Sequence, residues 1–360
     1  MSTNVNSQKK LLSVKNLKVS FKTGRNKFIN IVRGVDLNIY RGQIVGLVGE
    51  SGSGKSVTSK ALLNVNDNSF ISADRMRIYS QDDTYIDLSQ LKKERQWQKV
   101  RGHKIGYIPQ DPLTSLNPTR KIGKQLLDAL DKNKDWKNKS YSDKREYLTG
   151  LLKRFGIRNA DLVFDMYPHT LSGGMKQRVV ITMVVALKPD LIIADEPTTA
   201  LDPTVQASVL ALFDEISKSM NIAIILISHN ISIVAKFCDY IYVMYAGKIV
   251  EKGTKKDIFA YPAHPYTWAL ISAIPENKED RLYSIKGTPP DMNNLPLGDP
   301  FAPRNEYALE IDFIKEPPLI EISSTHSAAT WLLHPDAPKV ELKPELLARL
   351  KIFKEVFKDE

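Results

Sequence analysis

The segment GESGSGKS, Gly49 to Ser56, constrains the fold of this 360-residue chain more than any other stretch. It matches the pattern G-x-x-x-x-G-K-S, follows an apolar run from Ile44 to Val48, and precedes the helix-favouring segment SVTSKALL. In this setting the backbone N–H groups of a loop of small residues curl around phosphate oxygens at the start of a helix. The sequence therefore predicts a phosphate-binding loop after a buried strand.

Within this loop, Lys55 adds a positive charge, and the Ser56 hydroxyl is a candidate ligand of Mg²⁺. An ordinary glycine turn would leave Lys55 unexplained. The loop residues expected to contact the nucleotide are Gly49, Glu50, Ser51, Gly52, Ser53, Gly54, Lys55, Ser56 and Val57.

Two further apolar runs end in polar residues: Leu191 to Ala194 precedes Asp195, and Ile222 to Ile227 precedes His229. Both runs are too short and too continuous for amphipathic helices, so they are predicted to be buried parallel strands. Ligands of open α/β sheets bind beyond the carboxyl ends of the strands. We therefore expect these polar residues to lie near the phosphate-binding loop.

Two adjacent acids, Asp195 and Glu196, follow the second run. A pair of carboxylates at the end of a buried strand serves packing poorly, so each is expected to have a chemical role. Asp195 would hold Mg²⁺ directly or through water, and Glu196 would polarise the attacking water as a general base or positioning group.

The segment LSGGMKQR, residues 171–178, supplies a second set of anion-binding backbone amides, because Ser172 and two glycines open an apparent helix. One nucleotide does not need two such cradles. This segment, a short distance before the acidic pair, resembles the signature sequence of ABC ATPases.

The resemblance assigns further residues in order along the chain. Gln110 in IGYIPQDP resembles the Q-loop and would also ligate Mg²⁺, while TALD, Thr199 to Asp202, resembles the D-loop. His229 in LISHN resembles the switch histidine that contacts the γ-phosphate. For stacking on adenine, Phe21 in LKVSF is the best match, and Phe28 is the second choice.

The resemblance also implies a dimer, because in this family each ATP lies between the phosphate loop of one cassette and the signature of another. This chain has one copy of each, so either a homodimer or a heterodimer with a similar subunit is implied. The residues expected to face the partner's ATP are Ser172, Gly173, Gly174, Gln177 and Asp202.

Longer segments are similar to the D-type ATP-binding subunits of oligopeptide and dipeptide importers. These segments are GESGSGKSVT, QDPLTSLNP, YPHTLSGGMKQR and ADEPTTALDPTVQ, followed by FAYPAHPYTWALISAIP, GTPPDMNNLP and PFAPR in the C-terminal part. The resemblance implies a peripheral subunit on the cytoplasmic face of the membrane. Its implied partners are an F-type paralogue, two membrane permease subunits and, indirectly, an extracellular substrate-binding protein.

The expected fold is α/β, of the P-loop NTPase class and the ABC ATPase type. Residues 1–255 would form the nucleotide-binding domain, with a mixed sheet core and a helical signature subdomain at about 112–180. Of the 20 prolines, 13 follow residue 255, so residues 256–360 are expected to form a small proline-rich extension. An apparent helix, ELLARLKIFKEVF, lies near its end.

The extension departs from its family in one respect. Related extensions commonly carry four cysteines that bind an iron-sulfur cluster, and the corresponding positions here look like Asp299, Asn305, Asp312 and Thr330. The single cysteine of the chain is Cys238. We therefore predict ATP and Mg²⁺ as cofactors and no iron-sulfur cluster.

The net positive charge of the chain leaves a second class of function open, that of a soluble ABC ATPase which contacts nucleic acid. The net charge is +10, and basic stretches occupy residues 1–30 and 92–104, which we interpret as solvated faces rather than a nucleic-acid site. The alternatives are an importer motor for another solute such as nickel, or a soluble ABC ATPase of translation or DNA repair. Those soluble proteins usually carry two cassettes, long coiled coils or zinc insertions, which this sequence lacks. No apolar run resembles a spanning helix or a signal peptide.

Overall fold

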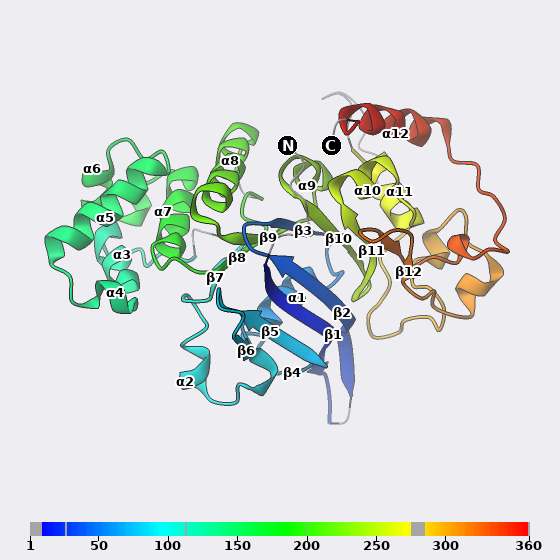
Figure 1. Cartoon of the computed structure of the whole chain (residues 1–360), viewed down its shortest axis with the longest axis horizontal. Helices are drawn as coiled ribbons and strands as arrows, with labels where there is room; N and C mark the ends of the chain where they lie inside the picture. Colours follow the sequence, from blue (N-terminus) through cyan, green and yellow to red (C-terminus); the bar gives the residue numbers. More distant parts are fainter. Residues whose placement is uncertain (1–8, 26, 112–113, 200, 275–284, 359–360) are drawn as a thin grey trace. The chain divides into compact units, whose positions relative to one another are not determined.

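The computed structural model describes residues 9–25, 27–111, 114–199, 201–274 and 285–358. Its contacts divide the chain into two compact units, and each combines distant parts of the sequence (Figure 1). The first unit comprises residues 1–39, 45–89 and 228–360, and the second comprises residues 40–44 and 90–227.

An antiparallel sheet lies in the first unit. Its strands are β1 (Lys10–Lys22), β2 (Phe28–Tyr40), β4 (Ser69–Ser72), β5 (Arg75–Tyr79) and β6 (Tyr85–Asp87), in the order β2-β1-β5-β6 with β4 also paired to β1. Apolar residues recur with the period of two that a sheet buried on one face requires, as in β5, where Met76 and Ile78 are buried.

A second group of strands in the first unit carries the phosphate loop. The strand before the loop is β3 (Ile44–Val48), which is buried along its length and parallel to β10 (Tyr240–Tyr245). Strand β11 (Lys248–Thr254) continues antiparallel from β10, and the short hairpin β12 (Ile320–Glu321) and β13 (Ser327–Ala328) pairs onto β11. The C-terminal segment thus adds strands to the cassette sheet.

Helices of the first unit follow these strands. They are α1 (Lys55–Ala61), α9 (Ile231–Phe237), α10 (Lys255–Ala260), α11 (Pro265–Ser272) and α12 (Pro344–Val356). Helix α9 packs closely on β3 at Gly46. A Cβ at this position would lie 2.5 Å from Cγ1 of Val234 in α9, so a larger residue would not fit without a shift. The predicted C-terminal helix is confirmed as α12, which starts at a proline and buries Leu346 and Leu350.

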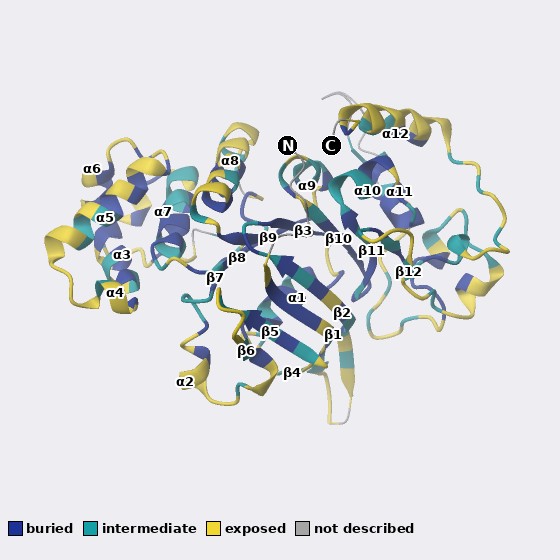
Figure 2. Ribbon diagram, in the orientation of Figure 1, coloured by how far each residue is buried: buried dark blue, intermediate teal, exposed yellow. Residues whose placement is uncertain are grey.

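The second unit contains a parallel group of three strands, β7 (Ile105–Ile108), β8 (Leu191–Asp195) and β9 (Ala223–Ser228), in the order β7-β8-β9. Strands β8 and β9 are buried throughout (Figure 2), which confirms the interpretation of their continuous apolar runs. Their register pairs Asp195 with Ile227, so both strands end at the same edge.

Most of the second unit is helical. The helices are α2 (Glu94–Trp97), α3 (Ile122–Leu130), α4 (Lys134–Lys137), α5 (Tyr141–Arg154), α6 (Ala160–Asp165), α7 (Gly173–Val185) and α8 (Pro203–Met220). Helices α3 and α5 to α7 pack on one another through buried leucines and valines (Figures 1 and 2). None of the helices in the described part of the chain combines the length and the apolar character that a membrane span needs.

The expected domain boundary near residue 255 remains a prediction. Contacts place residues 256–360 in the first unit, together with the phosphate loop, and therefore do not separate the extension as a compact body. A boundary inferred from composition describes a change in sequence character, which need not coincide with a change in packing.

Within the first unit, Tyr242 of β10 bonds to β2 through both functions of its hydroxyl group. It accepts from the Asn38 N–H at 3.0 Å and donates to the Asn38 carbonyl at 3.0 Å, and its side chain is almost fully buried. We expect Tyr242→Phe to lower the free energy of unfolding by about 1–3 kcal/mol, because backbone groups lose a buried partner. Urea denaturation measures this loss. The exposed Tyr261→Phe serves as the control, and equal effects of the two would contradict the assignment.

Candidate nucleotide site

The phosphate loop is shaped by its glycines. Gly52 and Gly54 have φ values of 81° and 102°, a region that favours glycine, and a Cβ at Gly49 would lie 2.1 Å from the Met244 carbonyl oxygen. A Cβ at Gly52 would meet nothing within 4 Å, and Ser51 and Gly52 are exposed. The loop therefore has an open side lined by backbone, as a phosphate cradle requires.

Lys55 lies inside this loop. Its side chain is 5% exposed, and its Nζ donates to the carbonyl oxygens of Gly49 and Glu50, both at 2.8 Å. Ser56 and Val57 follow in the first turn of α1 and are partly exposed. The predicted loop residues are thus brought together around one ammonium group, and they fit the binding of a nucleotide phosphate.

The acidic strand end is built within the second unit. Asp195 is 3% exposed and accepts a hydrogen bond from the Tyr107 hydroxyl at 2.8 Å. Burial, followed by the negative charge of Asp195, raises the pKa of Tyr107, so this hydroxyl remains a donor. A carboxylate oriented in this way fits a metal-binding role. The sequence analysis did not identify Tyr107 as a site residue, because the sequence does not show which strands pair with each other.

Glu196 has a strained backbone with a φ of 46°, which is uncommon for a residue other than glycine, and its N–H donates to the Ile227 carbonyl at 3.1 Å. Its carboxylate accepts from Gln110 Nε2 at 3.0 Å and from the Thr199 hydroxyl at 3.1 Å. The structure thus brings Gln110 and Glu196 together, as a water-positioning pair requires, and adds Thr199.

The signature segment is capped by Ser172, whose Oγ accepts from the Met175 N–H at 3.3 Å at the start of α7. A Cβ at Gly174 would lie 2.6 Å from Cγ1 of Val205, so this glycine allows α7 to approach α8. Asp202 caps α8 by accepting from two backbone N–H groups. Ser172, Gly173 and Asp202 are exposed and therefore accessible to a ligand.

Gln177 differs from these residues, because it is 0% exposed. Among the described residues, its side-chain amide has no hydrogen-bond partner at either atom. Its position on the inner face of α7 does not present it to solvent with Ser172 and Gly173. Its expected role toward a partner's ATP remains a prediction.

His229 and Phe21 belong to the first unit. His229 directly follows β9 and is exposed, as a residue that contacts a ligand must be. Phe21 lies near the end of β1, opposite Ser69, and is partly exposed. Phe28 is 52% exposed and meets Phe70 edge to face, with ring centroids 5.2 Å apart. Both aromatics are thus accessible, and their order of preference is unchanged.

Comparisons with known proteins assign the family. The ABC transporter family model matches residues 32–199, and the model of the oligopeptide/dipeptide transporter C-terminal region matches residues 250–311. The oligopeptide transport ATP-binding protein OppD of Mycoplasma genitalium is 46% identical, with 97% of this chain and 95% of that protein covered. The dipeptide transport ATP-binding protein DppD of Lactococcus lactis is also 46% identical, over 97% and 98% of the two chains. This chain belongs to the ABC transporter ATP-binding proteins.

Solved structures agree with this ABC ATPase fold. A dimeric ATP-binding cassette in a post-hydrolysis state, bound to ADP and Pi, matches with a TM-score of 0.58 and 24% identity, covering 68% of this chain and 99% of that chain. Another match is cbiO1 of Clostridium perfringens, part of an ABC transporter complex, with a TM-score of 0.57, 26% identity and coverage of 70% and 91%. The predicted fold class, ATPase activity and family resemblance are confirmed, and the fold implies nucleotide use.

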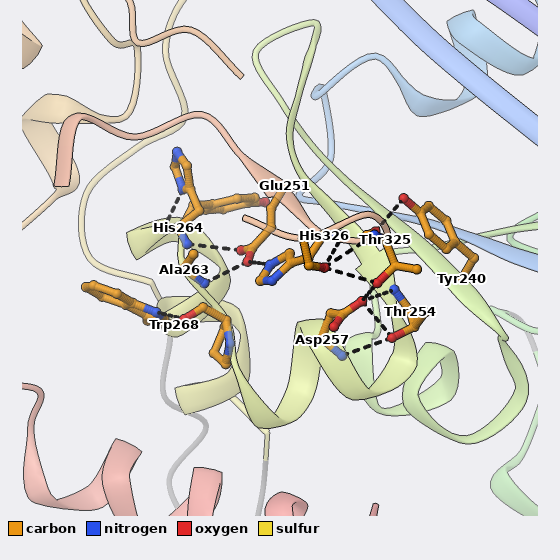
Figure 3. Close-up of polar contacts among 12 residues, drawn as sticks. Tyr240, Glu251, Thr254, Asp257, Ala263, His264, Trp268, Thr325 and His326 are labelled. Atoms are coloured by element: carbon orange, nitrogen blue, oxygen red, sulfur yellow. Dashed lines mark hydrogen bonds and ion pairs between the residues drawn. The ribbon is translucent and has the colours of Figure 1, made fainter. Parts of the chain in front are cut away.

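The C-terminal region of this ABC ATPase is attached through a buried carboxylate, Glu251 of β11 (Figure 3). Glu251 accepts from the N–H groups of Ala263 and His264 at 2.7 and 3.1 Å, and it lies 2.8 Å from Nε2 of His326. Burial lowers the pKa of His264 to about 3, so its ring is neutral and its Nδ1 accepts from the Tyr266 N–H. Residues far apart in the sequence are thereby joined.

The four residues expected to stand at the family's cysteine positions are acceptors of backbone N–H groups. Asp299 accepts from Phe301 at 3.0 Å, Asp312 from Leu309 at 2.7 Å, Asn305 from Tyr307 at 2.9 Å, and Thr330 from Leu332 at 3.2 Å. These oxygens fix turns in the extension. The chain's single cysteine, Cys238, is buried, and burial raises the pKa of its thiol.

These four residues do not fit an iron-sulfur cluster, because hard oxygen ligands already bonded to N–H groups replace soft thiolates. Among the described residues, no group of three or more histidine, cysteine, aspartate or glutamate side chains is arranged to hold a metal ion. The extension's lack of a cluster remains a prediction, which anaerobic purification and iron analysis would test.

Asp299 makes the stability of this ABC ATPase dependent on pH. Burial, together with nearby Asp312 and Glu316, raises the pKa of Asp299 to about 6, although the Phe301 N–H opposes this. Because the folded chain holds the proton more tightly than the unfolded chain, this carboxyl group destabilises the fold progressively as pH rises from about 4 through 6.

Asp299→Asn keeps the acceptor and removes this effect. We expect its stability advantage over the parent chain to grow by about 2 kcal/mol between pH 4.5 and pH 7.5, as measured by urea denaturation. The matched control is Asp291→Asn, because Asp291 is exposed and backbone N–H donation from Asn293 lowers its pKa. A pH-independent difference for Asp299→Asn would contradict the prediction.

Proposed function

We propose that this ABC ATPase energises the uptake of oligopeptides or dipeptides through separate membrane permease subunits, bound at the cytoplasmic face of the membrane. One observation carries the proposal: cassette and C-terminal region both match, along nearly the whole chain, proteins named for oligopeptide or dipeptide transport. An F-type paralogue, two permease subunits and an extracellular binding protein would complete the transporter.

The proposed cofactors are ATP and Mg²⁺. Gly49 to Val57 would hold the phosphates, with Lys55 as the fixed positive charge, and Phe21 would stack on adenine. Ser56, Asp195 and Gln110 would hold the metal ion, which neutralises charge on the phosphates when bound. The support comes from the exposed Ser51 and Gly52 of the loop and from the oriented, buried carboxylate of Asp195.

Glu196 is proposed as the residue that orients and deprotonates the attacking water. Gln110 and Thr199 both donate to Oε2 of Glu196, which holds this carboxylate in a defined orientation. His229 would contact the γ-phosphate. Because the donors fix the carboxylate before reaction, little reorganisation is needed in the transition state.

A dimer is proposed because Ser172, Gly173, Gly174, Gln177 and Asp202 would face the ATP of a second cassette. The support is the exposure of Ser172, Gly173 and Asp202 at the starts of α7 and α8. Either a second copy of this chain or a similar subunit could fill the partner position. Mass photometry with and without ATP would identify the stoichiometry.

Two substitutions separate binding from turnover. We expect Glu196→Gln to retain ATP binding and to lose at least about 10²-fold in kcat, because the amide cannot accept a proton. Lys55→Ala should weaken ATP binding itself, because a charge inside the loop is removed. Equilibrium binding of ATP and phosphate release measure the two effects. Normal turnover by Glu196→Gln would contradict the assigned role.

The cargo is tested in the assembled transporter. Subunits that copurify from solubilised membranes would be reconstituted in liposomes, and ATP hydrolysis would be measured with the binding protein and a peptide mixture or nickel. We expect peptides to stimulate hydrolysis. Stimulation by nickel alone would contradict the peptide assignment, and recovery of ribosomes or DNA in place of permeases would contradict transport.

A further inference from the structure

Glu50 introduces a negative charge into a loop that binds a polyanion. It is the second residue of GESGSGKS, and its carbonyl oxygen accepts from Lys55 Nζ at 2.8 Å. A carboxylate so close to the phosphates of ATP would repel them unless another group neutralised it. The loop therefore requires a local positive charge besides Lys55.

The C-terminal extension supplies this charge through Arg304. Arg304 Nη1 lies 2.6 Å from Glu50 Oε2, and Nη2 lies 2.9 Å from Oε1, so the guanidinium group binds both oxygens in parallel. The side chain of Arg304 is 4% exposed and that of Glu50 is 24% exposed. Limited solvent access makes this pair stronger than a surface ion pair.

Arg304 is itself held in place by residues of the extension and of β10. Its Nε donates to the Lys286 carbonyl at 2.9 Å, and its Nη1 donates to the Tyr245 hydroxyl at 3.1 Å. The guanidinium carbon lies 5.9 Å from the ring centroids of Tyr245 and Phe301. The Glu50 carboxylate raises the pKa of Arg304 further above its ordinary value, so the charge persists at every physiological pH.

A second contact fixes the backbone of Glu50. The Tyr266 hydroxyl accepts from the Glu50 N–H at 2.7 Å, and Tyr266 is 0% exposed. Its ring packs against Tyr245 and Phe301, with centroid distances of 4.6 and 5.3 Å. The N–H, carbonyl and carboxylate of Glu50 are thus all engaged: the carbonyl binds Lys55, and the other two groups bind residues that follow β11.

We propose that Arg304 is a positioning residue for nucleotide binding. It neutralises the Glu50 carboxylate and holds it in place. The affinity for ATP therefore depends on the contact between the C-terminal extension and the phosphate loop. This inference rests on the proposed binding of ATP phosphates at Lys55. Arg304 acts through Glu50 and need not touch ATP. Displacement of the extension would leave the carboxylate uncompensated and lower the affinity for ATP.

The test is a double-variant cycle on the full chain, with a fluorescent ATP analogue and Mg²⁺ as the probe. Arg304→Gln should raise the Kd by about tenfold, because an unpaired carboxylate then repels the phosphates. Glu50→Gln should lower the Kd below that of the parent chain, because Arg304 keeps its charge. The double variant should return to within about threefold of the parent chain.

Recovery in the double variant distinguishes charge balance from a merely structural role, because loss of packing by Arg304 would persist there. A double variant as weak as Arg304→Gln would overturn the proposal, as would an unchanged Kd in Arg304→Gln. If Arg304→Gln does not fold, Glu50→Gln decides the question alone: a lower Kd supports the proposal, and a higher Kd overturns it.

The matched control is Lys343→Ala, which breaks an exposed ion pair with Glu306 elsewhere in the extension and should leave the Kd unchanged. Lys55→Ala separates the two levels of inference. If it leaves binding intact, the proposed phosphate site is wrong. If it abolishes binding while Arg304→Gln has no effect, only the role of the extension is wrong.

Discussion

The bonds from Lys55 to the carbonyls of Gly49 and Glu50 are the interaction on which the candidate nucleotide site depends. A buried ammonium group needs acceptors, and the loop provides them only when its backbone curls around the side chain. This curvature requires positive φ values at Gly52 and Gly54 and brings Gly49 against β10. The loop's amides are thereby arranged before any ligand arrives, so binding does not have to order them.

Local sequence patterns predicted much of this fold. The continuous apolar runs identified β3, β8 and β9, because a strand buried on both faces leaves no polar positions. The same runs located Asp195 at the end of β8 and His229 directly after β9, while the roles of these residues remain predictions. That β8 and β9 end at the same edge of the sheet was also predictable, because they are parallel strands.

Contacts between distant segments could not be predicted in this way. The ion pair between Glu50 and Arg304 joins residues 254 positions apart, and no periodicity connects them. Tyr107 contacts Asp195 because β7 pairs with β8, which is a property of strand order rather than of either sequence segment. The left-handed backbone of Glu196 is likewise imposed by its surroundings, since glutamate has no preference for it.

The hairpin β12 and β13 has a consequence for how the chain can vary. By pairing with Glu251 and Lys252, it covers part of the outer edge of β11, whose backbone groups would otherwise be open to pairing with another chain. A chain cut off after β11 would therefore expose a sheet edge that can pair with another chain, in addition to losing the C-terminal segment. Protection against aggregation is therefore a role of this hairpin that does not depend on any cofactor in the extension.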